Sequence, residues 1–590
     1  MAQTVLEIFD ATVRAHGARP ALAHRRDGRW PAISWSEYAD TVRAAGAGLV
    51  ALGVGRGEGV VVLSANRPEW FVAHLAAITV GARPAGIYTS STPDQCRYIA
   101  EHAGAVVAVV DDERALARLL GAGRPACLRT AVVMDGAPAG ALSWADLLAR
   151  GDAASRTEVS RRAAAARAQD VCTLIYTSGT TGMPKAVMLT QRNLAFIAER
   201  APEILPVGPG DHLVSYLPLS HIAEQVTSFL LSLVTGATVH FVASLEALPQ
   251  ALQEVRPRVF FGVPRVWEKI QAGVEAKAAK ARPLQRRILD WARRQGRAGG
   301  DADQQGRPRP WGHAVAERLV FAGVRRRLGL DRARFLAVSA APIARETLDF
   351  FQSLGLPIME IYGMSECTGP TTVSRPARYR LGRAGVALPG TELRTAEDGE
   401  ILIRGPHVFA GYARDAETSR EVLDADGWLH SGDVGEIDED GFLRVTDRKK
   451  ELLITSGGKN IAPQYLEGRL RQIPGVSQAV TVGDGRPYVV ALLALDPARV
   501  ASMAEEAGSP ARTPQEAAGC PRFAAHLQAQ VEAINATLAR YETVKRVALL
   551  PRELTVEAGE LTPTLKLKRR VILERYREQV DALYAEPLSP

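Results

Sequence analysis

The segment Tyr176–Thr190 (YTSGTTGMPKAVMLT) combines hydroxyl side chains, two glycines and one lysine, and it lies between two apolar runs. Backbone N–H groups in glycine-rich turns form concave anion sites, and serine and threonine hydroxyls add donors. Lys185 adds a positive charge that suits a phosphate. The segment is not a P-loop, because Lys185 follows a proline and no hydroxyl residue comes next. We predict a phosphate-binding loop of another type, rather than an ordinary polar turn, formed by Thr177, Ser178, Gly179, Thr180, Thr181, Gly182 and Lys185.

Three other segments carry polar residues in patterns that suit ligand binding. The string Ile361–Pro370 (IYGMSECTGP) places the carboxylate of Glu366 shortly after a tyrosine and a glycine. Asp433 and Arg448 lie in GWLHSGDVGEIDEDGFLRVTDRKKELL, a charged hairpin in which a carboxylate can accept from two hydroxyls. The string LTPTLKLKRR near the C-terminus is typical, on its own, of the basic start of a helix. Each pattern is weak alone, so the four must be interpreted together.

Taken together, the four strings resemble the adenylate-forming (AMP-binding) superfamily, which includes acyl-CoA synthetases, luciferases and adenylation domains. The resemblance covers nearly the whole chain and implies that ATP is a substrate. It implies a magnesium site at Thr177 and Glu366, and hard oxygen ligands suit Mg²⁺ bound to triphosphate. Besides the phosphate loop, the ATP- and AMP-binding residues that it implies are Tyr362, Gly363, Met364, Ser365, Asp433 and Arg448.

The C-terminal strings resemble the mobile part of the family. The catalytic lysine corresponds to Lys566, although Lys568 stays an alternative because a leucine precedes Lys566 where the family usually has glycine. Lys450 corresponds to the hinge between a large and a small domain. Gly457 and Gly458 correspond to the path of the CoA pantetheine arm, where glycine permits close backbone approach.

The acyl side of the site most resembles long-chain and bubblegum-type fatty acyl-CoA synthetases, through YLPLSHIAEQ and FFGVPRVWEKI. The resemblance places His221 beside the acyl-adenylate. It also places Ala340, Ala341 and Pro342 of VSAAPIA along the acyl pocket. Ser339 stands where glycine is frequent, so we expect a slightly narrower pocket.

The implied reaction is the ATP-dependent activation of a fatty acid, expected to be long-chain, to acyl-AMP, followed by transfer to CoA with release of AMP and pyrophosphate. The implied catalytic residues are Lys566, Lys185, Glu366 and His221. Two alternatives within the superfamily are an acyl-AMP ligase that loads a carrier protein and an enzyme that activates another carboxylic acid. An alternative of another class is a catalytically silent nucleotide-binding or membrane-surface module. Chain length, branching, pathway and oligomeric state stay open.

The elements that position these residues follow from the hydrophobic pattern. Strand–helix alternation such as GVVVLSANRPEWFVAHLAAITVGARPAGIY predicts parallel sheets with helices on both faces. We therefore expect an α/β fold with a large N-terminal domain, residues 1–447, of two parallel-sheet αβαβα subdomains. A small β-barrel-like subdomain is expected over about 381–447, and a small mobile α+β C-terminal domain over 448–590.

Composition limits the partners and the cellular location that we expect for the protein. The 590 residues carry a formal charge of +7, with no basic stripe interleaved with aromatics, so a nucleic-acid partner is not expected. Widely spaced cysteines and the absence of an apolar leader indicate a cytoplasmic protein. The uncharged segment Val226–Leu245 is expected to be buried core. The Arg-rich segment Gln271–Leu330 is expected to form helices around a flexible loop, GGDADQQGRPRP. Its Ile288, Leu289 and Trp291 fit an amphipathic helix, so peripheral contact with the inner membrane face stays an alternative.

Overall fold

The computed structural model of the chain describes residues 4–177, 183–449, 451–456, 459–562 and 566–585. Its N-terminal part contains a seven-stranded sheet of order β7-β6-β5-β3-β4-β8-β9. Neighbouring strands are parallel, except that β9 runs antiparallel to β8. The strands are β3 (Gly59–Leu63), β4 (Arg83–Ile87), β5 (Ala105–Val110), β6 (Thr130–Val133), β7 (Leu142–Ser143), β8 (Val171–Thr177) and β9 (Lys185–Thr190).

Both faces of this sheet are covered by helices, as the strand–helix alternation predicts. Val60 and Val62 of β3 pack in one hydrophobic cluster with α2 (Trp35–Ala51) and α3 (Pro68–Thr79). The alternate residues Val61 and Leu63 pack in a second cluster with α4 (Pro93–Ala103) and α5 (Glu113–Leu120). The strand is therefore apolar on both faces, which is typical of a parallel sheet between two helical layers.

The second parallel-stranded region is divided into two sheets. One has the order β10-β11-β1-β2 and the other β12-β13-β14-β15-β16, and each begins with parallel strands and ends in antiparallel ones. The strands are β1 (Pro20–His24), β2 (Ala32–Ser34), β10 (His212–Ser215), β11 (Thr238–Phe241), β12 (Val259–Gly262), β13 (Phe335–Val338), β14 (Met359–Met364), β15 (Gly369–Val373) and β16 (Val386–Ala387).

A four-stranded antiparallel sheet follows, in the region where a β-rich subdomain is predicted. Its strands are β17 (Glu392–Thr395), β18 (Glu400–Arg404), β19 (Leu429–Ile437) and β20 (Leu443–Arg448). The β19–β20 hairpin is important for the site because Asp433 pairs with Arg448 across it.

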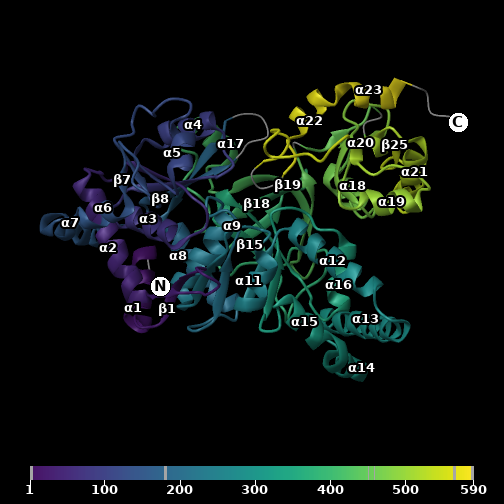
Figure 1. Ribbon diagram of the computed structural model, residues 1–590, viewed down its shortest axis with the longest axis horizontal. Helices are drawn as coiled ribbons and strands as arrows, with labels where there is room; N and C mark the ends of the chain where they lie inside the picture. The colour runs from purple at the N-terminus through teal and green to yellow at the C-terminus, as the bar shows by residue number, and fades with distance from the viewer. Residues whose placement is uncertain (1–3, 178–182, 450, 457–458, 563–565, 586–590) are drawn as a thin grey trace.

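The C-terminal part is a smaller α+β unit at the opposite end of the molecule from α2 (Figure 1). It contains the hairpin β21 (Leu453–Ile454) and β22 (Asn460–Ile461) and the sheet β23 (Val476–Val482), β24 (Val489–Leu495) and β25 (Val544–Leu549). Helix α18 (Pro463–Leu470) follows the hairpin. The remaining helices are α19 (Val500–Glu506), α20 (Pro514–Ala518), α21 (Pro521–Asn535), α22 (Arg569–Arg575) and α23 (Arg577–Ala585). The predicted fold class is thus confirmed.

The Arg-rich segment differs from its prediction. The helix α13 (Pro283–Gln304) continues through GGDADQ, so only the second half of the expected loop lies outside it. A side chain at Gly299 would meet the ring of His313 at 2.2 Å, and one at Gly300 would meet Gln352 at 2.2 Å. These glycines therefore let α13 approach α14 (Trp311–Ala316) and α16 (Arg345–Ser353) closely, rather than breaking the helix.

The uncharged segment Val226–Leu245 is largely buried, as predicted. It forms most of a π-helical turn, η1 (Gln225–Leu230), then α10 (Leu231–Thr235) and β11. Gly236 turns the chain between α10 and β11 with φ of +69°. Within the described ranges, the model contains no helix whose length and apolar character would let it cross a bilayer.

Candidate active site

The predicted phosphate loop connects two antiparallel strands. Thr177 ends β8, Lys185 begins β9, and the two residues pair across the base of the connection. Ser178, Gly179, Thr180, Thr181 and Gly182 lie outside the described residues. The structure therefore places the two ends of the loop side by side.

The Lys185 ammonium lies among residues from a later segment of the chain. Its Nζ is 3.3 Å from Oγ1 of Thr418 and 3.9 Å from Oδ2 of Asp415, and it lies 5.3 Å from the centre of the Tyr412 ring. The side chain stays 43% exposed, so its charge remains available to a ligand. The sequence analysis did not select Tyr412, Asp415 or Thr418, since no motif marks them.

Glu366 is positioned by the same segment. It lies in the short 3-10 turn η3 (Ser365–Cys367) directly after β14, and the Tyr412 hydroxyl donates to its Oε1 at 2.7 Å. Its backbone carbonyl accepts from the N–H of Phe409 at 2.8 Å. Burial and the neighbouring Glu366 raise the pKa of Tyr412, so the phenol remains a donor. Lys185 and Glu366 thus share Tyr412 as a neighbour.

Strand β14 requires glycine at position 363, where it pairs with Pro370 of β15. A Cβ there would lie 1.7 Å from the carbonyl oxygen of Gly369, so no other residue fits without moving the backbone. Ser365 is buried and Met364 is half-buried beside it. This close approach fixes the backbone next to Glu366.

Tyr362, Asp433 and Arg448 form one hydrogen-bonded and ion-paired group. The Tyr362 hydroxyl donates to Oδ2 of Asp433 at 2.9 Å, and Nε of Arg448 lies 3.3 Å from Oδ1. Burial raises the pKa of the Asp433 carboxyl, and Arg448 opposes this shift. The group joins β14 to the β19–β20 hairpin.

Lys566, from the C-terminal unit, interacts electrostatically with this group. Burial and the positive charge of Arg448 lower the pKa of Lys566 to about 8, while Asp433 and Glu366 oppose the shift. Lys568 instead lies at the N-cap of α22. Lys566 thus lies within electrostatic range of Arg448, Asp433 and Glu366.

His221 lies within electrostatic range of Lys566. Burial, and then the charge of Lys566, lower the pKa of His221 to about 4, so the imidazole is neutral at neutral pH. Its Nδ1 accepts from the backbone N–H of Ala223 at 3.1 Å, within the cap of α9 (Ile222–Glu224). The ring proton must then be on Nε2, which leaves Nε2 as a donor.

The predicted acyl-pocket loop lies between β13 and α16. Ala340 has a φ of +75°, a left-handed conformation that favours glycine. Ser339 does not have a positive φ. Ala341 and Pro342 are exposed, and Ala340 is half-buried. The position at which glycine would relieve strain is therefore Ala340 rather than Ser339.

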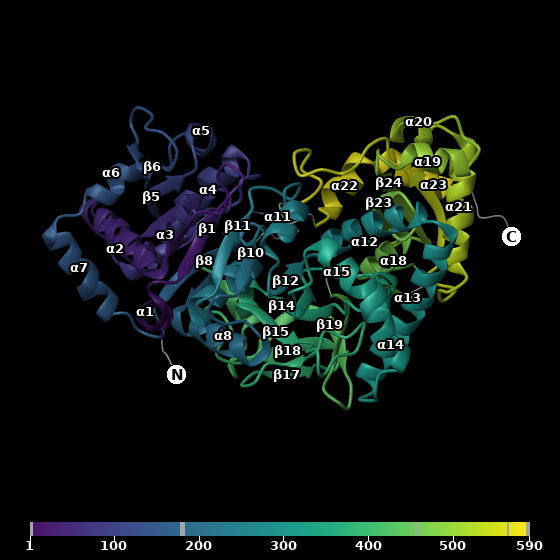
Figure 2. The ribbon, with the colours of Figure 1, turned by 60° about the horizontal axis from the view of Figure 1, so that its bottom comes forward.

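The C-terminal unit contacts the N-terminal part through ion pairs, and Figure 2 shows α12 (Pro264–Ala279) beside α18. Two α18-region arginines reach α12 and α16 of the N-terminal part: Arg471 lies 3.3 Å from Glu268, and Arg469 lies 3.6 Å from Glu346. Arg265 lies 3.7 Å from Glu553. The predicted hinge Lys450 and the predicted CoA-path glycines Gly457 and Gly458 fall outside the described residues.

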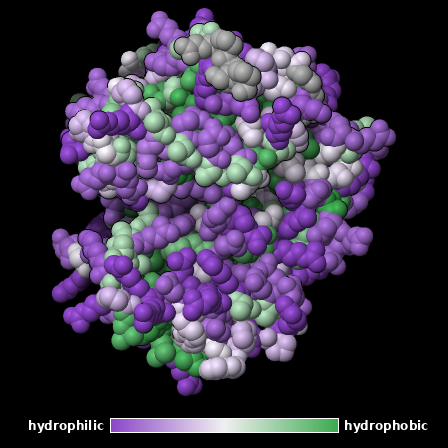
Figure 3. Space-filling model, turned by 90° about the vertical axis from the view of Figure 1, so that its right-hand side faces the viewer, coloured by the Kyte–Doolittle hydropathy of each residue, from purple (hydrophilic) through white to green (hydrophobic). Residues whose placement is uncertain are grey.

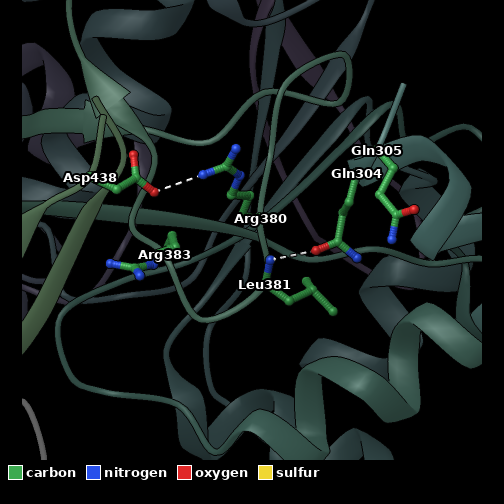
Figure 4. Close-up of a pocket in the computed structure, with 6 residues that line it drawn as sticks. All are labelled: Gln304, Gln305, Arg380, Leu381, Arg383 and Asp438. Atoms are coloured by element: carbon green, nitrogen blue, oxygen red, sulfur yellow. Dashed lines mark hydrogen bonds and ion pairs between the residues drawn. The ribbon is translucent and has the colours of Figure 1, made fainter. Parts of the chain in front are cut away.

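A separate cavity of about 610 Å³ lies at the turn end of the β19–β20 hairpin (Figure 4). Its arginines are already paired, since Arg380 lies 2.8 Å from Asp438 and Arg383 lies 3.0 Å from Glu436. Leu381 donates its N–H to Gln304 at 2.9 Å. The cavity is thus a charge-neutral polar site, remote from Asp433 along the hairpin.

The donor set at Glu366 fits magnesium. The described residues contain no group of three or more His, Cys, Asp or Glu side chains arranged to hold a metal. Tyr412 occupies Oε1 of Glu366, and no described residue donates to Oε2. A single carboxylate with a free oxygen suits Mg²⁺, which is commonly held by one or two carboxylates, substrate phosphates and water.

Comparisons with known proteins agree with this geometry. Residues 9–413 match the AMP-binding enzyme family, and residues 450–587 match the AMP-binding enzyme C-terminal domain. The chain is 35% identical to the long-chain-fatty-acid–CoA ligase ACSBG2 of Xenopus laevis, over 100% of this chain and 84% of the relative. It is 36% identical to the long-chain-fatty-acid–CoA ligase FadD15 of Mycobacterium tuberculosis, over 95% and 93%.

Solved structures share the fold at low identity. The anthranilate CoA ligase AuaEII in complex with anthranoyl-AMP has a TM-score of 0.74 at 19% identity, covering 98% of each chain. ATP-bound MatB from Rhodopseudomonas palustris has a TM-score of 0.69 at 20% identity, covering 98% of this chain and 99% of MatB. The motifs, the site they build and the full-length relatives lead to one conclusion: the chain belongs to the AMP-binding enzyme family.

Proposed function

We propose that this protein is a long-chain fatty acid–CoA ligase. A fatty acid carboxylate attacks the α-phosphorus of ATP, giving acyl-AMP and pyrophosphate; the CoA thiol then attacks the acyl carbon, giving acyl-CoA and AMP. The observation that carries the proposal is that Tyr362, Asp433 and Arg448 form one bonded group and that Lys566, from the other part of the chain, lies within electrostatic range of Asp433 and Arg448. The curated relatives of full length support the choice of acid and acceptor.

In this proposal the nucleotide is held by the Tyr362–Asp433–Arg448 group and the β8–β9 loop. Asp433 accepts from ribose hydroxyls once its own partners rearrange, and Tyr362 lies against the base. Lys185, whose side chain is 43% exposed and whose Nζ lies 3.9 Å from Oδ2 of Asp415, holds the departing phosphates. The glycines and hydroxyls of residues 178–182 are assigned to the same phosphates through the family resemblance.

Magnesium is assigned to Glu366 and Thr177. When bound, Mg²⁺ neutralises charge on the triphosphate and so favours departure of pyrophosphate. Glu366 is held for this task by Tyr412, whose hydroxyl fixes one carboxylate oxygen and leaves the other to the metal.

Lys566 acts in the first half-reaction. Its ammonium stabilises the negative charge that develops on the α-phosphoryl group and the attacking carboxylate, a preorganised electrostatic effect. His221, neutral and with Nε2–H as donor, orients the acyl carboxylate from the other side. No protein nucleophile is needed, and burial raises the pKa of Cys172 and Cys367, which agrees with inert thiols.

The second half-reaction is assigned to a rotation of the C-terminal unit about Lys450. This rotation withdraws Lys566 and brings Gly457 and Gly458 to the path of the CoA arm. The domain limits 1–447 and 448–590 belong to this proposal.

The test is a panel of carboxylic acids of increasing chain length, each scored for exchange of radioactive pyrophosphate into ATP and for AMP release with CoA. We expect exchange without CoA and AMP release with CoA, both strongest for long-chain acids. Exchange with AMP release only when an acyl carrier protein replaces CoA would identify the carrier-loading alternative. Preference for an aromatic or short acid would contradict the assigned substrate. No pyrophosphate exchange with any acid would contradict the proposal that the protein is an acid-activating enzyme.

A further inference from the structure

Exposed apolar side chains are concentrated on one pair of helices. Within the described part of the chain, ten large hydrophobic residues are exposed, and five of them lie between residues 284 and 319. These five define what we call the apolar patch: Leu284 (69% exposed), Ile288 (40%), Trp311 (84%), Val315 (37%) and Leu319 (67%). All eight tryptophans of the chain are described, and Trp311 alone among them is classed as exposed.

The patch follows the helical repeat. Trp311, Val315 and Leu319 are spaced four residues apart on α14 and the π-helical turn η2 (Glu317–Phe321) that continues it, so they lie along one side. The opposite side packs inward, since Ala316 and Phe321 form a buried cluster with Ala292 of α13. Figure 3 shows hydrophobic side chains gathered at the lower edge of one face, the end where Figure 1 places α14.

The sequence pattern predicts a different amphipathic face, formed by Ile288, Leu289 and Trp291. Leu289 and Trp291 are partly buried and pack against the protein interior, and only Ile288 is exposed. The exposed face is therefore formed mainly by α14 and η2, which the sequence analysis did not select.

The charge around the patch is strongly positive. Residues 282–328 contain twelve arginines and four acidic residues, a net charge of +8, whereas the whole chain carries +7. The rest of the chain, with 60 basic and 61 acidic residues, is thus nearly neutral. Nine exposed arginines here form no ion pair with any described residue: Arg282, Arg286, Arg287, Arg294, Arg297, Arg307, Arg318, Arg326 and Arg327.

We propose that α13, α14 and η2 form a docking surface for an anionic lipid bilayer. Exposed tryptophan and leucine insert among the lipid headgroups while the arginines face anionic phosphates, a combination typical of peripheral membrane helices. A second copy of the chain is disfavoured as the occupant, because a two-fold symmetric contact would place two +8 segments face to face. Acidic proteins or nucleic acids would match the positive charge of the arginines but would leave the apolar patch without a partner.

The surface lies on the acyl side of the molecule. Helix α13 packs on α16, the helix that follows the Ala340 loop, through Gly296 and Gly300. A bilayer contact at this position would hold the enzyme at the phase in which long-chain fatty acids dissolve. The binding itself does not depend on the proposed catalysis, so the two proposals can fail separately.

The experiment measures flotation of the full chain with phosphatidylcholine vesicles, with or without roughly a third of phosphatidylglycerol. We expect binding to the anionic vesicles to be at least about tenfold tighter than to the neutral ones, and to weaken as NaCl rises from about 0.05 M to about 0.3 M. The double variant Trp311→Ser/Leu319→Ser should lose at least about tenfold in affinity, whereas Trp311→Phe should retain most of the binding.

The matched control is Leu245→Ser/Tyr541→Ser, which removes two exposed apolar side chains outside the patch and should bind like the wild type. Unchanged thermal unfolding and unchanged exchange of pyrophosphate with soluble decanoate would show that the patch variant is folded. Equal binding of the patch variant and the wild type would overturn the proposal, and so would equal loss in the control. A concentration-dependent dimer abolished by Trp311→Ser, without vesicle binding, would instead identify a second copy.

Discussion

Residues from the N-terminal part and residues from the C-terminal unit meet at the candidate active site, and they are held there differently. Tyr362, Asp433 and Arg448 lie on strands and bind one another directly. Lys566 lies in the segment before α22 and reaches the same site only through the placement of the whole C-terminal unit. The residues from the N-terminal part are thus held by the sheets, whereas the position of Lys566 depends on how the C-terminal unit packs on the N-terminal part.

The hydrophobic clusters show the same contrast. Among the described residues, no cluster includes members from both sides of position 450: the C-terminal clusters begin at Leu453, and the N-terminal ones end at Val445. Across the interface the described contacts include ion pairs such as Arg471–Glu268. Pairs of this partly exposed kind contribute only about 0.2–1 kcal/mol each. Such an interface can separate and re-form, which a rotating catalytic unit requires.

The largest expected loss of activity follows from removing the amine that the C-terminal unit supplies. Lys566→Ala should lower the rate of acyl-AMP formation by about 10²–10³-fold, the usual effect of losing one electrostatic stabiliser. CoA-ester formation from supplied acyl-AMP should persist, because the proposed mechanism uses Lys566 only in the first step. Both half-reactions are measured separately. Lys568→Ala is the matched control and should be near normal; the reverse result would transfer the role to Lys568.

The second prediction concerns the separate cores. Leu493→Ala, in the core of the C-terminal unit, should destabilise that unit by about 2–5 kcal/mol while leaving the N-terminal part intact. Leu230→Ala should do the opposite. Hydrogen exchange resolved along the chain measures both. A uniform loss of protection across the chain in either variant would mean that the two parts unfold as one.

The third prediction uses the pKa of Lys566, about 8 in the free enzyme. Because the protonated amine is the active form, kcat/KM for ATP should fall above pH 8, by about tenfold per pH unit well above the pKa. Lys566→Arg should shift this limb to higher pH, whatever its absolute rate. A wild-type profile that stays flat to pH 10 would show that Lys566 is not the titrating group.

The smallest expected effect concerns the ion pairs between the units. Glu268→Gln with Glu346→Gln should lower acyl-AMP formation by roughly two- to tenfold, since the pairs hold Lys566 at the site and each contributes about 0.2–1 kcal/mol. CoA-ester formation from supplied acyl-AMP should be unchanged or faster. Glu392→Gln, which removes an exposed ion pair within one sheet, is the control. Equal losses in both half-reactions would contradict a role in domain placement.

Much of the fold follows from local pattern. The alternation of β3, α3 and β4 is visible in the spacing of apolar residues, because each strand must be apolar on both faces. The continuity of α13 is not visible in this way. Gly299 and Gly300 resemble a helix break in sequence, and only the positions of His313 and Gln352, far along the chain, show that these glycines permit close packing.

The site was predictable where a motif marks it and not elsewhere. Glu366 and Lys185 belong to recognisable strings, whereas Tyr412, which contacts both, lies in a segment without any such signal. The same holds for the loop strain at Ala340, which depends on a dihedral angle that residue types do not reveal. The position of Tyr412 and the dihedral angle of Ala340 depend on contacts between distant parts of the chain, so the local sequence does not reveal them.

The hairpin of β8 and β9 has a consequence for how phosphate is held. In a P-loop the phosphates sit at the start of a helix, whose macrodipole attracts the anion before any side chain acts. Here the chain leaves the loop as a strand, and strands contribute little net dipole. In the proposed site, the attraction comes from the charge of Lys185, from the metal when it is bound, and from the N–H and hydroxyl donors assigned to the loop. Pyrophosphate release should therefore respond to the charge at position 185.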